Sequence, residues 1–394
     1  MHPTVVDVAI VGAGPYGLSL AAHLAGRGVK VRIFGRPMRF WREHMPRGML
    51  LKSDGFASSL SEPTGHYTLK TWCAENGEPY ADMGLPVTLE QFCAYGQAFQ
   101  RRCVPFLEPT EVQHLSRHPQ GFALSLSSGD IALARRVVVA TGIAPFAYLP
   151  EPLQGLPTHL VSHSGQHTDL SRFAGQEVAV LGSGASAGDT AALLQDGGAR
   201  THLISRRPVR FHNPPNGPRS LWQRLRQPDS GLGPGWKSYL CAYAPRVFHA
   251  MPQSLRLRAV ARHLGPAPGW FVRDKVVGKV TLKPGFTLQS AEPEGDRLRL
   301  HFRHTQGQTH DLVVDHVIAA TGYRANLARL AYLDPELRDA VRQVHHTPVL
   351  DRHFQSSVPG LYFVGALAAN SFGPLLRFAY GADFTAKHLA RHLG

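Results

Sequence analysis

The chain opens with short apolar runs that alternate with segments of helical periodicity. Residues 5–11 are nearly all apolar and mostly β-branched, which is typical of a parallel strand buried on both faces. A glycine-rich turn follows, then a helical pattern over 18–24 that stops at Gly26, and then a second apolar run over 29–34. Strand, helix and strand within about 30 residues predict a βαβ unit of an open parallel sheet.

The same order recurs in the middle of the chain. Residues 178–181 read as a strand, 188–194 as a helix and 201–204 as the next strand. Two further apolar runs, 136–140 and 317–320, both continue into Ala-Thr-Gly turns and roughly bracket this second unit. The bracketing indicates that the second unit is inserted into the first.

We therefore expect an α/β protein with two Rossmann-like dinucleotide-binding domains. The first would use residues 1–150 and, after the insertion, 323–394. The second would use residues 151–322, with a further insertion over 208–270 that is rich in Pro, Gly, Trp and Arg and has no clear period.

Other segments give weaker signals. Residues 89–100 read as a helix, 121–127 and 130–134 as a hairpin, and 286–304 as a meander. Near the end, Gly373 and Pro374 are start signals for a helix from Leu375 to His392.

Composition narrows the class of protein. The chain is 43% hydrophobic and 18% charged, a globular mix that excludes a disordered chain or a coiled coil. We find no apolar run long enough to cross a bilayer, so we expect no membrane association. The net charge of +14 favours anionic ligands. Because the basic residues are dispersed and no recognition motif accompanies them, we expect phosphorylated small molecules and no nucleic acid.

The four cysteines are scattered and none forms a CxxC pair. This pattern argues against a disulfide framework, a zinc ribbon and a redox dithiol. Nothing at the N-terminus reads as a secretory signal, so we expect the protein in the cytoplasm. His163 and His167 have a metal-ligand spacing, but Gly165 lies between them and histidines are numerous, so we expect no metal.

The first glycine motif is Gly12-Ala13-Gly14-Pro15-Tyr16-Gly17, which is GxGxxG between a strand and a helix. Glycines there allow a tight turn, close approach of a pyrophosphate and packing of helix on strand. The next strand ends at Gly35-Arg36 without the acid that usually binds a ribose. Either backbone groups or Glu43 would have to bind it.

The second motif, Gly182-Ser183-Gly184-Ala185-Ser186-Ala187, is GxGxxA. Its following strand ends at Ser205-Arg206-Arg207, with Arg206 placed 22 residues after Gly184. Arginine at this position suits the 2′-phosphate of NADP, through its charge and its planar fork of donors.

Two nucleotide sites on one chain imply hydride transfer from NADPH to FAD. With no CxxC pair to accept the electrons, oxygen is the simplest acceptor. A reductase that passes electrons to a separate protein is an alternative. A serine hydrolase is another, because residues 184–188 also read as GxSxG around Ser186.

The two motifs, both Ala-Thr-Gly turns and the C-terminal turn at Gly365 resemble, in this order, the single-component FAD- and NADPH-dependent monooxygenases. Residues 40–45 and 48–54 look like the segment that N-hydroxylases of this family lay beside the flavin ring. Residues 49–53 and 371–374 are also similar to a bacterial group that contains an FAD-dependent urate hydroxylase. Residues 208–270 match least.

The resemblance implies hydroxylation of a small nucleophilic or aromatic substrate by O2 through a C4a-hydroperoxyflavin, at a nitrogen centre or on a purine-like ring. It implies Lys52, Asp54 and Asn370 beside the flavin. The cofactor-binding residues implied by the motifs and the resemblance together are Gly12, Gly14, Pro15, Tyr16, Gly17, Gly35, Arg36, Trp41, Lys52, Ser53, Thr141, Gly142, Gly182, Ser183, Gly184, Ser186, Ala187, Ser205, Arg206, Arg207, Thr321, Gly322, Gly365, Gly373, Pro374 and Leu375.

One subgroup pattern of the family is not met. The FxGxxxHxxx(W/Y) pattern would fall on His163, Gly165, Asp169 and Phe173, and only the glycine matches. This departure argues against Baeyer–Villiger activity and against the activity of typical flavin-containing monooxygenases.

Overall fold

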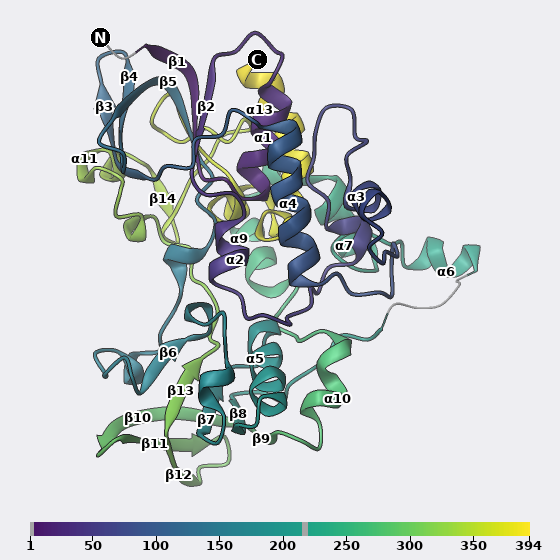
Figure 1. The fold of residues 1–394 in the computed structure, drawn as a ribbon, viewed down its shortest axis with the longest axis vertical. Helices are drawn as coiled ribbons and strands as arrows, with labels where there is room; N and C mark the ends of the chain where they lie inside the picture. Colours follow the sequence, from purple (N-terminus) through teal and green to yellow (C-terminus); the bar gives the residue numbers. More distant parts are fainter. Residues whose placement is uncertain (1–3, 215–219) are drawn as a thin grey trace.

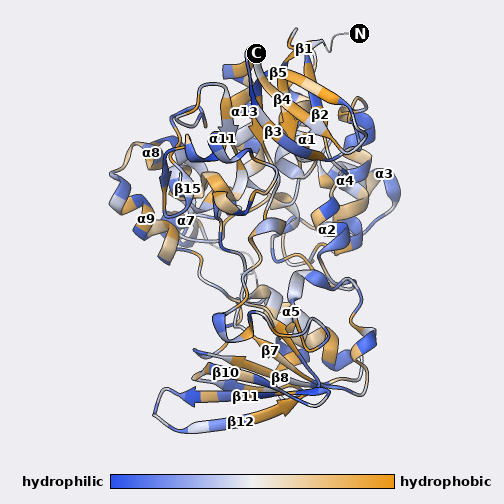
Figure 2. Cartoon of the chain, turned by 90° about the vertical axis from the view of Figure 1, so that its left-hand side faces the viewer, coloured by the Kyte–Doolittle hydropathy of each residue, from blue (hydrophilic) through white to orange (hydrophobic). Residues whose placement is uncertain are grey.

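The computed structural model describes residues 4–214 and 220–394. Two sheets lie at opposite ends of the long axis, and both termini lie at the end of the first sheet (Figure 1). The central strands of both sheets are largely hydrophobic, as their colouring in Figure 2 shows. Apolar strands covered by helices thus form the centre of each half.

The first sheet has the strand order β2-β1-β5-β4-β3, and β16 also pairs with β5. The parallel strands are β1 (Val5–Val11), β2 (Val31–Phe34), β5 (Ile131–Val139) and β16 (Leu361–Phe363). The antiparallel strands are β3 (Val112–His118) and β4 (Gly121–Leu126).

Strand β5 differs from the expectation of two separate strands over 130–134 and 136–140. On one edge, β4 pairs with residues 131–134 and β16 pairs with residues 137–139. On the other edge, β1 pairs along nearly the whole length. Because β1 holds both halves in line, they form one strand of nine residues.

Helices α1 (Pro15–Leu24) and α13 (Gly381–Leu393) contact each other beside the first sheet. Helix α4 (Leu89–Cys103) confirms the predicted helix and begins with a capping box formed by Thr88 and Gln91. Two shorter helices, α2 (Arg39–Glu43) and α3 (Leu69–Asn76), contact α4 and were not predicted.

The predicted C-terminal helix over 375–392 is wrong at its start. Residues Pro374–Arg377 form a 3₁₀ turn, Phe378 is extended, and α13 begins only at Gly381. The hydroxyl of Tyr16 donates a hydrogen bond of 2.7 Å to the carbonyl of Phe378. The same carbonyl accepts from the amide of Gly381 at 3.1 Å, so both bonds hold the extended residue between the 3₁₀ turn and α13.

The second sheet is entirely parallel, with the order β6-β13-β7-β8-β9. Its strands are β6 (Val161–His163), β7 (Glu177–Leu181), β8 (Arg200–Ser205), β9 (Thr281–Pro284) and β13 (His316–Ala319). Helix α5 (Ala185–Asp196) packs on β7 and β8 and also contacts α10 (Arg273–Val276). This sheet uses only residues that lie, in sequence, between β5 and β16.

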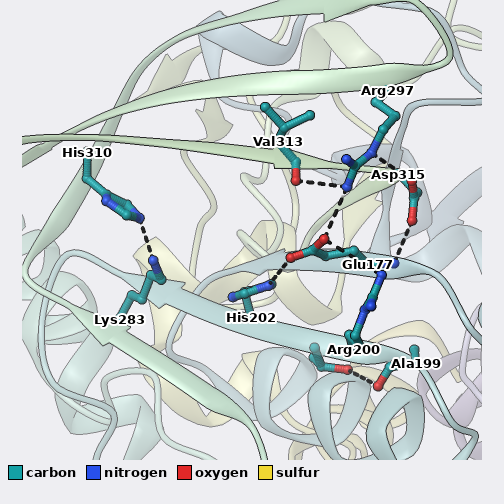
Figure 3. Close-up of polar contacts among 10 residues, drawn as sticks. Glu177, Ala199, Arg200, His202, Lys283, Arg297, His310, Val313 and Asp315 are labelled. Atoms are coloured by element: carbon teal, nitrogen blue, oxygen red, sulfur yellow. Dashed lines mark hydrogen bonds and ion pairs between the residues drawn. The ribbon is translucent and has the colours of Figure 1, made fainter.

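An antiparallel meander adjoins the second sheet and extends the one predicted over 286–304. It consists of β10 (Phe286–Glu294), β11 (Arg297–His304) and β12 (Thr309–Val314). Figure 3 shows how Glu177 at the start of β7 links the two: its carboxylate lies 2.9 Å from His202 and 3.1 Å from Arg297, which also bonds Asp315 at 2.9 Å. These bonds connect strands from two different sheets.

Two chain segments connect the halves and run side by side. The amide of Tyr148 donates to the carbonyl of Gly322 at 3.0 Å, and that of Arg324 donates to the carbonyl of Phe146 at 2.7 Å. The Arg324 guanidinium lies over the Tyr148 ring, 3.3 Å from its centroid. The two connections therefore brace each other.

Residues 208–270 hold short helices that the sequence did not predict, and part of this segment, 215–219, lies outside the described residues. The helices are α6 (Leu221–Arg226), α7 (Trp236–Tyr243), α8 (Pro245–Ala250) and α9 (Gln253–Arg262). Helices α8 and α9 pack on α12 (Ala369–Phe372), near the C-terminus. The segment therefore packs on the first half of the molecule, although in sequence it lies between two strands of the second sheet, β8 and β9.

The remaining short elements connect these parts. They are α11 (Pro335–Asp339), β14 (Gln343–Val344), β15 (Thr347–Pro348), and 3₁₀ turns. No helix among the described residues is long and apolar enough to cross a membrane.

Candidate active site

A cavity of about 1300 Å³ lies between the first sheet and helix α5. Single ligand pockets usually measure about 300–1,000 Å³, so this cavity has room for more than one molecule. Its wall comes from segments that are distant in sequence, including 11–16, 49–54, 140–145, 185–186, 229–234 and 376–380.

The first glycine loop opens into this cavity. A Cβ at Gly12 would lie 2.4 Å from the carbonyl oxygen of Ala140, and one at Gly17 would lie 1.9 Å from the carbonyl oxygen of Gly12. These two glycines therefore serve close backbone packing. A Cβ at Gly14, in contrast, would meet no other described atom within 4 Å. Gly14 leaves free space on the ligand side of the turn.

Helix α1 starts at this turn with Gly14 as N-cap and Pro15 in the first position. Within the described residues, no side chain caps it and no acid lies in its first turn. Its unpaired amide groups and the positive end of its dipole thus face the cavity, beside the free space at Gly14. This arrangement fits the pyrophosphate of a dinucleotide.

The acid missing after Gly35 comes from a distant part of the chain, directly before β3. Glu111 lines the cavity beside Arg36 and contacts Arg36 and Arg39. Glu43, which the sequence offered as a candidate, is bound by the same two arginines at 2.7 and 3.0 Å and does not line the cavity.

Backbone pairing brings Glu111 to this place. The amide of Gly35 donates to the carbonyl of Glu108 at 3.1 Å, and Phe34 bridges Glu108 in a parallel sense. The separation of Glu111 from Gly35 in sequence explains why the spacing of the glycine motif gave no sign of it.

Lys52 and Asp189 line the cavity from different halves of the molecule. Asp189 is only 6% exposed, and burial raises its pKa to about 7, although the nearby Lys52 opposes this rise. Burial lowers the pKa of Lys52 to about 8, and Asp189 again opposes the shift. Among the described residues Asp189 forms no hydrogen bond and no close ion pair. Both groups thus titrate near neutral pH.

Other predicted residues of the same segment also line the cavity. Burial raises the pKa of Asp54, against the effect of a hydrogen bond from the amide of Gly84. Ser53 bonds the Ser58 hydroxyl at 2.8 Å. Trp41 packs edge-on against Phe92 with ring centroids 4.8 Å apart. The indole is therefore fixed in the wall.

The structure does not bring Asn370, Gly373, Pro374 or Leu375 to the cavity. The Asn370 amide donates to the Thr347 hydroxyl at 2.9 Å, and Pro374 and Leu375 are buried in the core. The 3₁₀ turn instead turns residues 376–380 into the wall. Gly365, the earlier glycine of this region, does line it.

The second glycine loop has the same steric design as the first. A Cβ at Gly182 would lie 2.3 Å from the carbonyl oxygen of Ala320, as at Gly12 and Ala140. Ala187 is fully buried against this turn. Both Ala-Thr-Gly turns therefore begin with a carbonyl that packs on a glycine loop.

The second loop differs from the first in its surroundings, because two prolines lie against it and against helix α5. A Cβ at Gly184 would lie 3.3 Å from the Cβ of Pro266, and one at Gly188 would lie 2.6 Å from the Cβ of Pro268. The cavity reaches α5 only at Ala185, Ser186 and Asp189, and Gly182, Ser183 and Gly184 lie outside it. We call residues 264–268 the proline cover.

The other predicted residues of the second unit also lie outside the cavity. Thr321 donates through its hydroxyl to the carbonyl of Tyr148, beside Gly322. Arg206 and Arg207 are exposed after the end of β8, where the Ser205 hydroxyl bonds the Arg207 carbonyl at 2.7 Å. Because β7 and β8 are parallel, both arginines lie at the same sheet edge as the second glycine loop. Thr141 and Gly142, the counterparts in the first unit, line the cavity.

The remaining candidates show no catalytic arrangement. Ser186 has no hydrogen bond to a histidine in the described part of the chain, so a hydrolase triad is not assembled. His163 bonds the carbonyl of Gly322 and His167 the hydroxyl of Ser162, and no group of three potential metal ligands occurs among the described residues. All four cysteines are free and none lines the cavity.

Comparison with known proteins places these motifs in a family. Residues 9–222 match the model of a family described as pyridine nucleotide-disulphide oxidoreductase. A ferredoxin–NADP reductase of Leuconostoc citreum is 24% identical over 372 residues, which cover 93% of this chain and 84% of that protein. The indole-3-pyruvate monooxygenase YUCCA1 of Oryza sativa subsp. japonica is 28% identical over 210 residues, 51% of this chain and 48% of that protein.

Among solved structures, the ornithine N-hydroxylase of Kutzneria sp. 744 superposes with a TM-score of 0.79. The alignment covers 99% of both chains at 17% identity. At this identity the likeness establishes the fold, and it confirms the predicted α/β class.

Proposed function

The chain belongs to the pyridine nucleotide-disulphide oxidoreductase family, and we propose that it is an FAD-dependent monooxygenase that takes its electrons from NADPH. The observation that carries this proposal is the cavity, which touches the first glycine loop and helix α5 of the second unit at once. The first glycine loop would hold FAD and the second unit NADPH, and this pair would supply the two electrons with which one atom of O2 enters a small substrate while the other leaves as water.

The first unit fits FAD. Gly14 leaves free space, α1 offers uncapped amide groups, and the wall at Arg36 and Glu111 carries hydrogen-bonding groups for a ribose. Met49, Leu50, Leu51 and Trp41 give the cavity an apolar wall beside the polar Lys52, Ser53 and Asp54, which suits a planar aromatic ring with polar edges.

The second unit fits NADPH at its sheet edge. Arg206 and Arg207 are exposed and would bind the 2′-phosphate. Ser186 and Asp189 are residues of the second unit that line the cavity. In this proposal residues 151–322 form the NADPH domain, and the segments 1–150 and 323–394 form the FAD domain.

Lys52 and Asp189 are the groups that hold or exchange protons in this cavity. Their pKa values of about 8 and about 7 allow either group to be charged or neutral near pH 7.5. Because both groups line the cavity, they can orient a substrate that offers both a hydrogen-bond donor and an acceptor. We therefore favour a small molecule with a nitrogen centre or a purine-like ring.

The molecule that accepts the electrons from the flavin distinguishes a monooxygenase from a disulfide reductase and from a ferredoxin reductase. A disulfide reductase needs a thiol pair at its flavin, and no cysteine lines this cavity. A reductase that delivers electrons to a separate protein is the second candidate. The match to a ferredoxin–NADP reductase along 93% of this chain favours it.

Oxygen consumption with product analysis tests the choice. Purified protein with NADPH in air would be screened against small amines, amino acids and purine-like compounds, and O2 uptake, H2O2 and product mass would be followed. The monooxygenase proposal expects one compound that accelerates O2 uptake, lowers H2O2 release and gains the mass of one oxygen atom. Rapid NADPH-dependent reduction of ferredoxin, with slow and uncoupled O2 uptake, would instead identify the reductase.

A further inference from the structure

Helices α6 to α9 expose large apolar side chains to solvent. Of the fourteen exposed large apolar side chains among the described residues, eight lie between positions 221 and 255, so the exposure is concentrated in this segment. They are Leu221, Trp222, Leu225, Trp236, Leu240, Tyr243, Val247 and Leu255. Trp222 is 82% exposed and Leu221 is 78% exposed. Such a concentration marks an interaction surface.

The helices that carry these side chains are linked, because α7 contacts α8, and α8 and α9 both pack on α12. Trp236, Leu240 and Tyr243 recur at helical spacing along α7, which contacts α8. The indole of Trp236 donates a hydrogen bond of 3.1 Å to the carbonyl of Leu225 at the end of α6. Figure 1 shows α6 at the periphery, beyond α7 and away from both sheets. We call this the α6–α9 surface.

The α6–α9 surface is also strongly basic. Residues 220–264 contain seven arginines and lysines but only one acid, Asp229. Five of these cations have exposed side chains and form no ion pair with another described residue: Arg226, Lys237, Arg246, Arg258 and Arg262. Several follow or precede an exposed apolar residue directly, as in Leu225-Arg226, Trp236-Lys237 and Arg246-Val247.

We propose that the α6–α9 surface docks on an anionic lipid bilayer. Helices that lie in a bilayer interface typically combine exposed Trp and Leu with exposed cations, as this surface does. The apolar side chains enter the acyl boundary while long basic side chains reach the headgroups. Because no described helix can span a membrane, the contact is peripheral, and it departs from the expectation of no membrane association.

Charge decides between this occupant and two others. A second copy would bring two surfaces of the same positive sign together, which opposes pairing. An acidic protein satisfies the charge, but it would also need a preformed pocket for each of Leu221, Trp222 and Leu225, which project from one short helix. A bilayer accepts projecting apolar side chains without a matching shape.

Residues of the same segment, including 229–234 and Leu264, line the cavity. Docking would therefore bring the bilayer close to one wall of the cavity. The proposal does not depend on the flavin chemistry, because it rests on the α6–α9 surface alone.

Vesicle sedimentation with the full-length protein tests the proposal. The vesicles would contain phosphatidylcholine alone or phosphatidylcholine with about one third phosphatidylglycerol. We expect partitioning at least about tenfold stronger on the anionic vesicles, and a loss of most of this difference between about 0.05 M and about 0.5 M salt.

Two pairs of substitutions separate the apolar and the basic contributions. Trp222→Ser with Leu225→Ser lowers partitioning about tenfold or more at every salt concentration, because apolar burial is lost. Lys237→Gln with Arg246→Gln lowers it about tenfold at low salt only. The matched controls are Ile131→Ser, which removes an exposed apolar side chain elsewhere, and Arg101→Gln with Arg117→Gln, which remove exposed cations elsewhere.

Equal sedimentation with neutral and anionic vesicles would overturn the proposal, as would control substitutions that weaken binding as much as the test pairs. Light scattering of the same samples without lipid measures whether the protein forms a dimer, which tests a second copy of the chain as the occupant of the surface. A dimer that Trp222→Ser with Leu225→Ser dissociates, in a protein that ignores vesicles, would assign the surface to self-association instead.

Discussion

The two glycine loops share one local design and differ in what surrounds them. In each, a glycine after a parallel strand packs against the alanine carbonyl of an Ala-Thr-Gly turn, at Gly12 with Ala140 and at Gly182 with Ala320. The first loop then opens into the cavity through Gly14. The second lies under the proline cover, with Pro266 against Gly184.

This difference separates two properties of a glycine motif, the geometry of its turn and the access of a ligand to that turn. The turn itself follows from close backbone packing, because a Cβ at Gly12, Gly17 or Gly182 would meet backbone atoms. Access for a ligand is decided by segments far away in sequence. The first loop lines the cavity, whereas Gly182, Ser183 and Gly184 of the second loop lie outside it, with Pro266 beside Gly184.

The largest expected effect separates packing from ligand space within the first loop. Gly17→Ala places a Cβ 1.9 Å from the carbonyl oxygen of Gly12, so we expect a loss of more than about 4 kcal/mol in the free energy of unfolding. Gly14→Ala meets no described atom and should cost less than about 1 kcal/mol. Denaturant unfolding of the two variants measures the contrast, and equal losses would refute the packing role.

A larger side chain at Gly14 tests the ligand space. Gly14→Val should fold, yet retain flavin at least about tenfold more weakly, equivalent to about 1.4 kcal/mol or more of binding free energy. The ratio of bound flavin to protein after gel filtration gives the result. Gly265→Val, at an open position outside the cavity that needs no positive φ, is the control. Full flavin content in Gly14→Val would remove the first loop from the FAD site.

The next effect concerns the donor's phosphate at the second loop. Replacing Arg206 and Arg207 together by Ala should raise KM for NADPH by about tenfold to a hundredfold, because two charge-assisted contacts are lost. KM for NADH should change less than about threefold. Steady-state kinetics with both donors decides, and parallel increases would contradict the assignment of these arginines.

Loosening the proline cover should make the second loop more like the first. With Pro266→Gly and Pro268→Gly, we expect NADPH to bind about threefold more tightly, because a larger fraction of the protein has an open loop. Pro150→Gly with Pro152→Gly, in the connection between the halves, is the matched control. Isothermal titration with NADP⁺ measures both. Weaker binding in the cover variant would mean that the prolines support the ligand.

The smallest expected effect is a pH dependence at the cavity. Burial raises the pKa of Asp189 from 3.8 to about 7, so the native state keeps a proton that the unfolded chain releases within this window. The wild type thus loses stability as pH rises from about 4 to about 7, and Asp189→Asn does not. The difference in Tm should therefore grow in favour of the variant across this window and level off above it. A constant difference would show that Asp189 is ionised throughout.

The sequence predicted what short-range sterics determine. Both glycine motifs, their strands and the Ala-Thr-Gly turns are in place because each depends on neighbours in the same unit. Glu111 was missed because it reaches the cavity through the backbone pairing of Glu108 with Phe34 and Gly35. The residue spacing of a glycine motif does not predict such a contact. The proline cover and α6–α9 were missed because prolines and glycines divide the segment into pieces too short for a clear period. Helices α8 and α9 are placed by packing on α12.

The C-terminal error has a similar origin. Gly373-Pro374 is a valid start signal, but the 3₁₀ turn that it starts ends at the extended Phe378, whose carbonyl accepts from Tyr16. Asn370 lies before this turn, where it bonds Thr347 and does not line the cavity. Conversely, Asp189 escaped attention because a single acid in a helix is ordinary until burial makes it unusual.

The visible spectrum during an anaerobic NADPH titration tests the central claim most directly, that one cavity serves a flavin and its phosphorylated donor. The account predicts a yellow protein whose flavin absorbance is bleached by NADPH, more slowly by NADH, and restored when O2 is admitted. A colourless protein that FAD does not reconstitute, or bound flavin that NADPH leaves oxidised, would contradict it.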